Sequence, residues 1–205
     1  MKKVIALLGM VMFCSSAFAL NTEAMLGESC ADQKVAFEKY AADQRNDFVA
    51  QHILINMADP MENMTDEQAL PLAACYATFK VKGMAFTSFV RAHAGVFPGD
   101  ITGKEEAELR NFADRVQRLS VQAKLNKIVA QGNTSHTIQF ILINFADPMV
   151  QMSDAQAAPL AKAYQGVKVN GQPMMEFVRV HASEFLGTVP QELDAFVNRV
   201  NQLAK

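Results

Sequence analysis

One nine-residue block occurs twice in this chain of 205 residues. Positions 53–61 read I-L-I-N-M-A-D-P-M, and positions 141–149 read I-L-I-N-F-A-D-P-M. The same spacing continues to Gly99 and Gly187, and about half of the aligned positions match. A match of this length at a constant spacing indicates an internal duplication. We therefore predict two tandem, sequence-similar units, covering residues 20–119 and 120–205.

The join between the two units lies near Leu119, and no stretch rich in proline, glycine or serine marks it. Domains that move freely are usually joined by such linkers. We therefore expect the two units to pack together.

Both units have the apolar spacing of helices. Residues that recur at i, i+3, i+4 and i+7 form one face of an amphipathic helix. No stretch alternates apolar and polar residues between turn signals, so strands are not expected. The predicted fold class is all-α. The two clearest faces comprise Phe86, Phe89, Val90, His93, Ala94 and Phe97 in the first unit, and Met174, Phe177, Val178, His181, Ala182 and Phe185 in the second.

Several helix starts can be placed from their capping residues. Capping boxes are expected at Thr65-x-x-Gln68 and at Ser153-x-x-Gln156. Proline fits the first turn of a helix but not its interior, so regular helix is expected only from Pro71 and Pro159 onward. A third box, Thr102-x-x-Glu105, predicts a longer helix that continues into the second unit, and Val189-Pro190 begins the last one.

The amino end has the pattern of a secretory signal peptide. Lys2 and Lys3 precede an apolar stretch, and Ala17-Phe-Ala19 has the form of a cleavage site. We expect residues 1–19 to be removed and the product to be periplasmic or secreted. No later segment is apolar enough over the 18 or more residues that a bilayer requires, so no transmembrane segment is expected in the mature chain.

Two cysteines remain after that cleavage, Cys30 and Cys75. In an oxidising compartment a pair is most simply one disulfide, and here it would contribute on the order of 3 to 4 kcal/mol. The two are far apart in sequence and lack the C-x-x-C spacing of redox-active thiols, so we expect a structural role.

Composition and missing motifs narrow the function. With 19 basic and 21 acidic residues the chain has no extended basic field, so nucleic acid is not an expected partner. There is no G-x-S-x-G, H-E-x-x-H, phosphate-binding glycine loop or C-x-x-C, so we predict no enzymatic activity. Asp59 and Asp147 are expected in turns, bonded to nearby backbone. Arg91 and Arg179 are expected to form structural salt bridges with Asp59 or Asp66 and their counterparts.

Histidine and methionine are the candidate ligands of a metal or haem. Thioethers favour copper(I), and a thioether with an imidazole can hold haem iron axially. The opposing interpretation is that these methionines fill the core and that each histidine is buried and bonded to a carbonyl. His52 and His136 have no counterpart in the other unit and are expected at the surface or at caps. The candidate metal ligands are Met61, Met64 and His93 in the first unit, and Met149, Met152 and His181 in the second.

The run from Ala58-Asp-Pro-Met through Met64 to Leu72-Ala-Ala-Cys-Tyr-Ala resembles the C-terminal part of class I cytochromes c, and positions 149–164 repeat it. The chain therefore resembles the tandem, diheme-type cytochromes of that family. The resemblance implies that Met61 or Met64, and Met149 or Met152, occupy the place of the axial methionine. The chain departs from the family because it has no C-x-x-C-H, so covalent haem attachment is not available.

Two functions follow from these patterns. The first is an exported, non-enzymatic helical module of cytochrome-c-like descent that binds a protein or a small ligand between or across its two units, without a cofactor. The alternative is haem or copper binding by the histidine and methionine sets, for electron transfer or metal handling.

Overall fold

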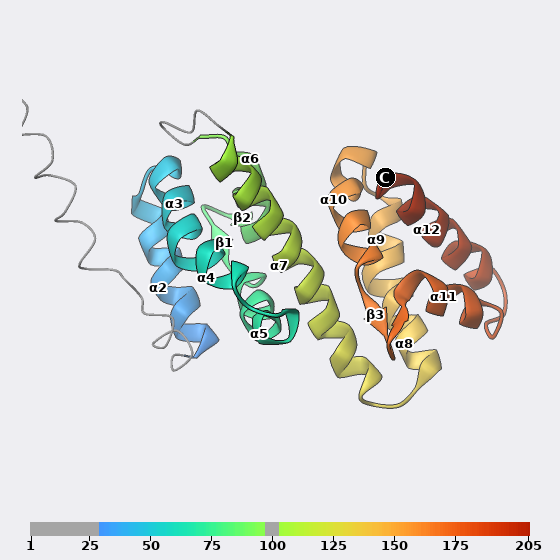
Figure 1. Cartoon of the computed structure of the whole chain (residues 1–205). Helices are drawn as coiled ribbons and strands as arrows, with labels where there is room; N and C mark the ends of the chain where they lie inside the picture. Colours follow the sequence, from blue (N-terminus) through green and yellow to red (C-terminus); the bar gives the residue numbers. More distant parts are fainter. Residues whose placement is uncertain (1–28, 97–102) are drawn as a thin grey trace, which may run out of the picture.

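The computed structural model describes residues 29–96 and 103–205. Two helix positions that the sequence indicated, Phe97 and Thr102, lie outside this part, as does the expected signal peptide. The described chain is mostly α-helical, as predicted (Figure 1). None of its helices is both long and apolar enough to cross a membrane.

The first half contains short helices and one small hairpin. In chain order its elements are α2 (Cys30–Asp43), α3 (Asn46–Ile53), the π-helix η1 (Leu54–Ala58), α4 (Asp59–Glu62), α5 (Asp66–Tyr76), β1 (Lys80–Val81), β2 (Met84–Ala85) and α6 (Phe86–His93).

The second half repeats the order from α3 to α6 at a distance of 88 residues, the spacing of the repeated block (141 − 53), and then adds α12. Its elements are α8 (Thr134–Ile141), the π-helix η2 (Leu142–Ala146), α9 (Asp147–Val150), α10 (Asp154–Gln165), β3 (Lys168–Val169), β4 (Gln172–Pro173), α11 (Met174–Ala182) and α12 (Val189–Leu203).

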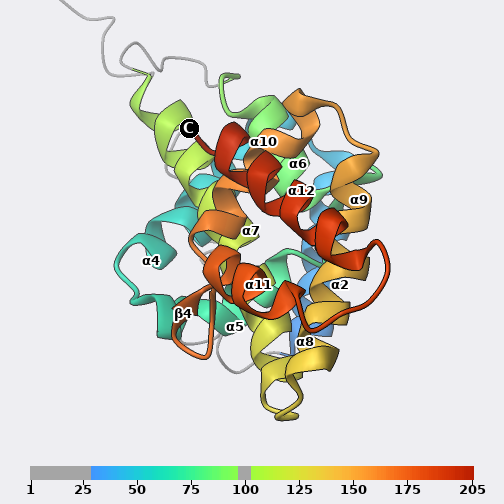
Figure 2. The ribbon, with the colours of Figure 1, turned by 90° about the vertical axis from the view of Figure 1, so that its right-hand side faces the viewer.

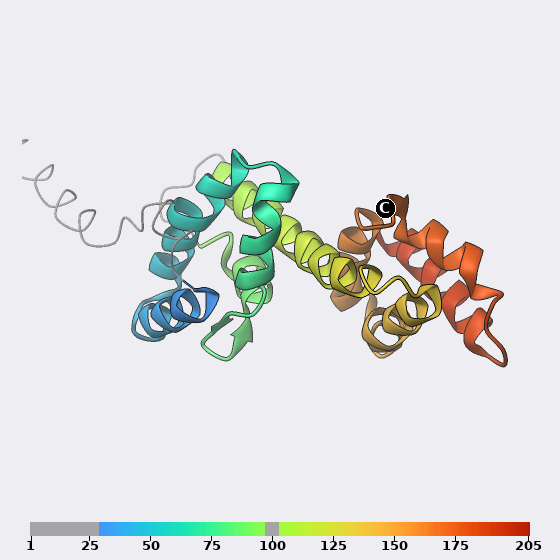
Figure 3. The same cartoon turned by 90° about the horizontal axis from the view of Figure 1, so that it is seen from below.

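A single helix, α7 (Lys104–Val129), joins the halves and belongs to both. Figure 3 shows it running from the first group of helices into the second. The apolar core of the first half includes α7 residues up to Leu119, and the core of the second half begins at Val121. The expected long helix that continues into the second unit is therefore present, and position 119/120 lies inside it.

The second part of α7 takes the place of α2. Counting back 88 residues aligns Phe37 with Leu125, and both are buried in their own cores. Helix α2 starts at Cys30, which is disulfide-bonded to Cys75 of α5. The predicted disulfide is thus confirmed. The second part of α7 is continuous with the helix before it, whereas α2 is the first described helix of the chain. The disulfide attaches α2 to α5.

The two hairpins were not expected from the sequence. Each pairs two residues on either side of a two-residue turn, at 82–83 and at 170–171. Both turn residues have positive φ in each case, for example 51° at Asn170 and 81° at Gly171. This is the backbone of a type I′ turn, for which Asn-Gly is the strongest short signal. Strands of two residues are too short for an alternating pattern to reveal.

Proline explains the π-helices. Pro60 and Pro148 have no N–H for the carbonyl four residues earlier, and the proline ring would crowd that carbonyl. The backbone widens there, and the N–H of Asp59 donates to the Leu54 carbonyl five residues back. Asp59 and Asp147 therefore begin short helices, α4 and α9, and do not sit in the turns that the sequence suggested.

Two of the three predicted capping boxes lie in the described residues and are present, at Thr65 with Gln68 and at Ser153 with Gln156. The helices start directly after them. The expectation that regular helix begins only at Pro71 and Pro159 was wrong, because each proline lies inside its helix. Closing helix α12 begins at Val189, as predicted.

Candidate functional site

The methionine turns are held by arginines. Arg115, on α7, donates from Nη1 to the Met61 carbonyl at 2.5 Å and from Nη2 to the Met64 carbonyl at 2.6 Å. Arg199, on α12, makes the same two bonds, with the same lengths, to Met149 and Met152. Each arginine also bonds the aspartate that follows the turn, Asp66 or Asp154; these carbonyl and aspartate contacts are named here as the arginine clamps.

The four candidate methionine ligands lie in or against the two apolar cores. Met61 and Met149 are only 1 % exposed and belong to the cores, while Met64 and Met152 pack against those cores. Because Met61 and Met149 fill the two cores, their recurrence has a structural explanation that does not involve sulfur ligation, and the clamps hold only the backbone of the methionine turns.

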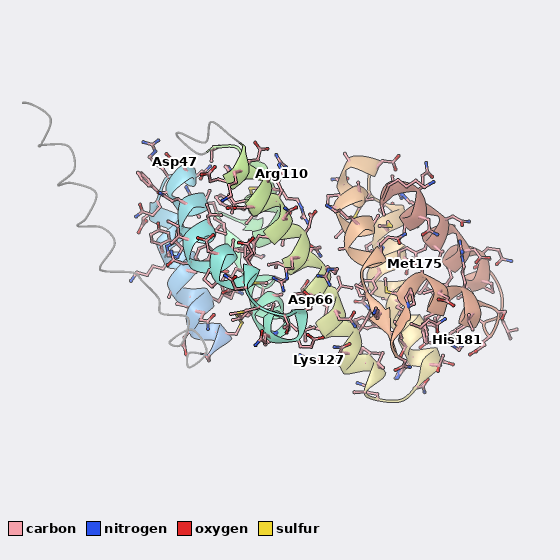
Figure 4. All side chains as sticks on the ribbon, viewed as in Figure 1. Asp47, Asp66, Arg110, Lys127, Met175 and His181 are labelled. Atoms are coloured by element: carbon pink, nitrogen blue, oxygen red, sulfur yellow. A yellow bond between two sulfur atoms is a disulfide. The ribbon has the colours of Figure 1, made fainter. Side chains whose placement is uncertain are left out.

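The two candidate histidines lie in different surroundings. His93 Nδ1 lies 3.0 Å from the Phe89 carbonyl and Nε2 lies 2.8 Å from the Asn46 amide nitrogen, so Nδ1 donates and Nε2 accepts. Its ring stacks on Phe89. His181 Nδ1 bonds Glu184 instead. Figure 4 places His181 on the side of the second half away from α7.

The hydrogen bonds of His93 and those of Met61 and Met64 involve different helices. His93 contacts α3, whereas Met61 and Met64 are bonded by α7. Within residues 29–96 and 103–205, no group of three or more histidine, cysteine, aspartate or glutamate side chains is placed to hold a metal ion.

The other two histidines also differ from each other. His136 is exposed in the first turn of α8, where its backbone N–H is capped by Asn133. His52 is half-buried, with its ring 4.5 Å from that of Tyr40, so the expectation of a surface or capping role was wrong for it. Burial lowers the pKa of His52 below its ordinary value.

The two halves meet where α10 packs against α7. Asp114 of α7 accepts from Lys162 of α10 at 2.6 Å and from Arg91 of α6 at 3.1 Å. The sequence predicted that Arg91 pairs with Asp59 or Asp66, and that was wrong. Asp114 is instead the link between α6 of the first half and α10 of the second.

Arg118 forms the other link. Its side chain lies over Gly166, at the end of α10, so closely that a Cβ there would be 2.3 Å from Arg118 Cδ. Its Nη1 donates to Asp66 of α5 at 2.8 Å. The hydrogen bond from Arg118, with the nearby charge of Arg115, lowers the pKa of Asp66.

A cavity of about 260 Å³ opens at this junction, named here the inter-unit cleft. It is lined by Asn111, Asp114, Arg115, Arg118, Lys162 and Ala163. The described ion pairs at this junction join four cations, Arg91, Arg115, Arg118 and Lys162, to two acids, Asp66 and Asp114, so this group has an excess of two positive charges.

A second cavity, of about 140 Å³, adjoins the cleft and shares Asn111 and Arg115 with it. Its other walls include Met61 and Phe112, and its charged groups are acidic: Asp59, Glu62 and Glu108. Burial, with the charges of Glu108 and Glu62, raises the pKa of Asp59. The two cavities together therefore have a basic end and an acidic end.

Several residues at the cleft have no counterpart of the same type at the 88-residue spacing. At the 88-residue spacing, Arg118 corresponds to Cys30, Lys162 to Ala74, Ala163 to Cys75 and Gly166 to Thr78. The disulfide of the first half is thus replaced by an arginine and an alanine that line the cleft. Sequence reasoning concentrated on matching positions and missed these residues; the unmatched charges at 118 and 162 were the signal that could have found them.

No protein-family model, curated protein or solved structure matches the chain.

Proposed function

We propose that this protein is an exported, non-enzymatic helical module that binds a small ligand between its two halves, in the inter-unit cleft. The observation that carries this proposal is the cavity itself, which lies where α10 meets α7 and is lined by residues of both halves. A ligand seated there contacts both halves at once.

The charges of the cleft support binding rather than packing alone. A junction that served only to hold the halves together would be expected to be apolar or to balance its charges, because uncompensated charge is costly to bury. Here Lys162 remains largely accessible, at 63 %, and the cations outnumber the acids. Those cations are therefore available to a partner from solution.

The test blocks the cleft and uses a matched control. Asn111→Trp places a large side chain in the lining of both cavities. Ala195→Trp places the same side chain at an exposed position of α12 that lies four residues before Arg199, as Asn111 lies four before Arg115, and Ala195 lines neither of the two cavities. The mature protein and both variants would be isolated from the exporting host and analysed by native mass spectrometry and by thermal-shift screening of small metabolites.

We expect a bound mass, or a stabilising metabolite, that Asn111→Trp abolishes and Ala195→Trp retains. Retention of the ligand by Asn111→Trp would contradict the proposal. Turnover of a defined substrate that single substitutions abolish would contradict its non-enzymatic part.

The cytochrome-c-like descent and the haem or copper alternative stay predictions. In the first half, a metal or haem bound by His93 would have to replace a bond of its ring, to the Phe89 carbonyl or to Asn46. Its direct test is the double variant His93→Ala/His181→Ala, whose bound copper or haem should fall if these side chains are ligands.

A further inference from the structure

We propose that the ligand of the inter-unit cleft is a small oxyanion, held between Arg118 of α7 and Lys162 of α10. This inference rests on the proposed function and adds the chemical class of the ligand and the two side chains that recognise it.

The position of the positive charge is the first argument. Asp114 and Arg118 are four residues apart on α7, so they lie on one face of the helix. Lys162 and Gly166 are four apart at the end of α10 and face them: Lys162 contacts Asp114, and Gly166 lies under Arg118. Two cations from different halves therefore border one cavity, with Asp114 beside them.

Hydrogen-bonding capacity is the second argument. Arg115 is committed to the clamp, where it makes bonds to two carbonyls and to Asp66. Among residues 29–96 and 103–205, Arg118 uses only Nη1, in its bond to Asp66, and Lys162 makes one bond, to Asp114. A guanidinium has five N–H donors and an ammonium three. Both groups can therefore donate to another acceptor without losing the bonds that they already form.

The comparison between halves is the third argument. The clamp is present twice, as Arg115 with Asp66 and as Arg199 with Asp154, so that pair is part of the fold. Arg118 and Lys162 are extra to it, because the corresponding positions of the first half hold Cys30 and Ala74. The acidic cavity next to the cleft keeps the anion at the Arg118 and Lys162 end, away from Glu62 and Glu108.

The size of the cleft sets the size of the ligand. About 260 Å³ is below the usual range for a drug-sized site, which starts near 300 Å³. A phosphate group or a short dicarboxylate fits this volume, and both present several oxygens to a guanidinium and an ammonium. The shared chemistry is an oxyanion with two negative charges, which matches the excess of two positive charges.

The experiment is an NMR titration of isotope-labelled mature protein with inorganic phosphate, and separately with succinate, at constant ionic strength maintained by sodium chloride. We expect saturable shifts of backbone amides within 111–118 and 162–166 for at least one of the two anions. The stronger binder identifies the ligand as a phosphate or a carboxylate.

Three single variants test the site. Lys162→Ala, which restores the residue of the first half, should weaken binding about tenfold or more, as expected for a lost charged hydrogen bond. Asp114→Asn removes a competing acid and should tighten binding. Lys127→Gln removes an exposed cation of the same helix outside the cleft and should leave the affinity unchanged. All three folds would be compared by far-ultraviolet circular dichroism.

Two results would overturn the proposal. Equal weakening by Lys162→Ala and Lys127→Gln would show general ionic attraction instead of a site. Absence of saturable shifts with either anion would exclude the oxyanion class. If the Asn111→Trp-sensitive ligand is nevertheless found, the binding function stands and only its ligand class fails; if that ligand is also missing, both fail.

Discussion

Replacing Arg199 by methionine should destabilise the second half by removing its arginine clamp. Methionine keeps an unbranched apolar stem that can contact the same neighbours, but it lacks the guanidinium and donates no hydrogen bond. The carbonyls of Met149 and Met152 then lose donors at 2.5 and 2.6 Å. Arg199 is three-quarters buried, so water replaces these bonds only in part.

The expected loss follows from those bonds. Hydrogen bonds from a charged group contribute about 1.5 to 3 kcal/mol each, and the lower figure applies to a partly exposed pair, which gives a total of about 3 kcal/mol. The ion pair with Asp154 adds less than about 1 kcal/mol, because that carboxylate is 74 % exposed. Asp154→Asn is therefore the matched control that removes the ion pair and leaves the carbonyl bonds in place.

Urea unfolding followed by far-ultraviolet circular dichroism measures the two free energies of unfolding, and hydrogen exchange locates the change. We expect lost protection around residues 149–154, with little change at the corresponding turn of the first half. The reasoning is refuted if Arg199→Met costs no more than Asp154→Asn, because the carbonyl bonds would then contribute nothing measurable.

Three further predictions concern single sites. Replacing Cys30 and Cys75 by alanine opens a 45-residue loop and should cost about 3 to 4 kcal/mol in urea unfolding; a cost below about 1 kcal/mol would contradict a structural role. Burial lowers the pKa of His52, so below about pH 6.5 the unfolded chain binds a proton that the folded chain does not, and stability falls. His52→Phe, which introduces the residue found at position 140, should reduce the fall in melting temperature between pH 7.5 and 5.5, and an unchanged fall would contradict this reasoning. Gly166→Ala places a Cβ against the Arg118 side chain and should lower the free energy of unfolding by about 1 to 3 kcal/mol in urea unfolding. An unchanged free energy of unfolding would show that the Arg118 side chain is not held against Gly166.

Sequence patterns predicted those features whose signals are local. The capping boxes at Thr65 and Ser153, the apolar faces of α6 and α11 and the start of α12 each depend on residues within a few positions, and the described parts of these features confirm the predictions. Local rules failed where two signals competed. At Pro71 the capping box six residues earlier determined the helix start, since proline costs less near the first turn than deep inside a helix.

The inter-unit cleft could not be predicted in the same way. Asp114 pairs with Lys162 across 48 residues, and Arg118 with Asp66 across 52. Spacing along one helix predicts which side chains share a face but not which helix of the other half they meet. Choosing Asp59 or Asp66 as the partner of Arg91 failed for this reason, because the acid that it meets comes from α7.

Helix α2 is attached by a disulfide, whereas the second part of α7 is held by its continuity with the first part, and this difference has a consequence for biogenesis. The second half has its first helix in place as soon as α7 has formed, since that helix continues from the first half without a break. The first half depends on a covalent bond that forms only where thiols are oxidised. Protein made in a reducing cytosol should therefore have a folded second half, while α2 lacks its covalent attachment to α5. Oxidation alone should then form the disulfide and attach α2.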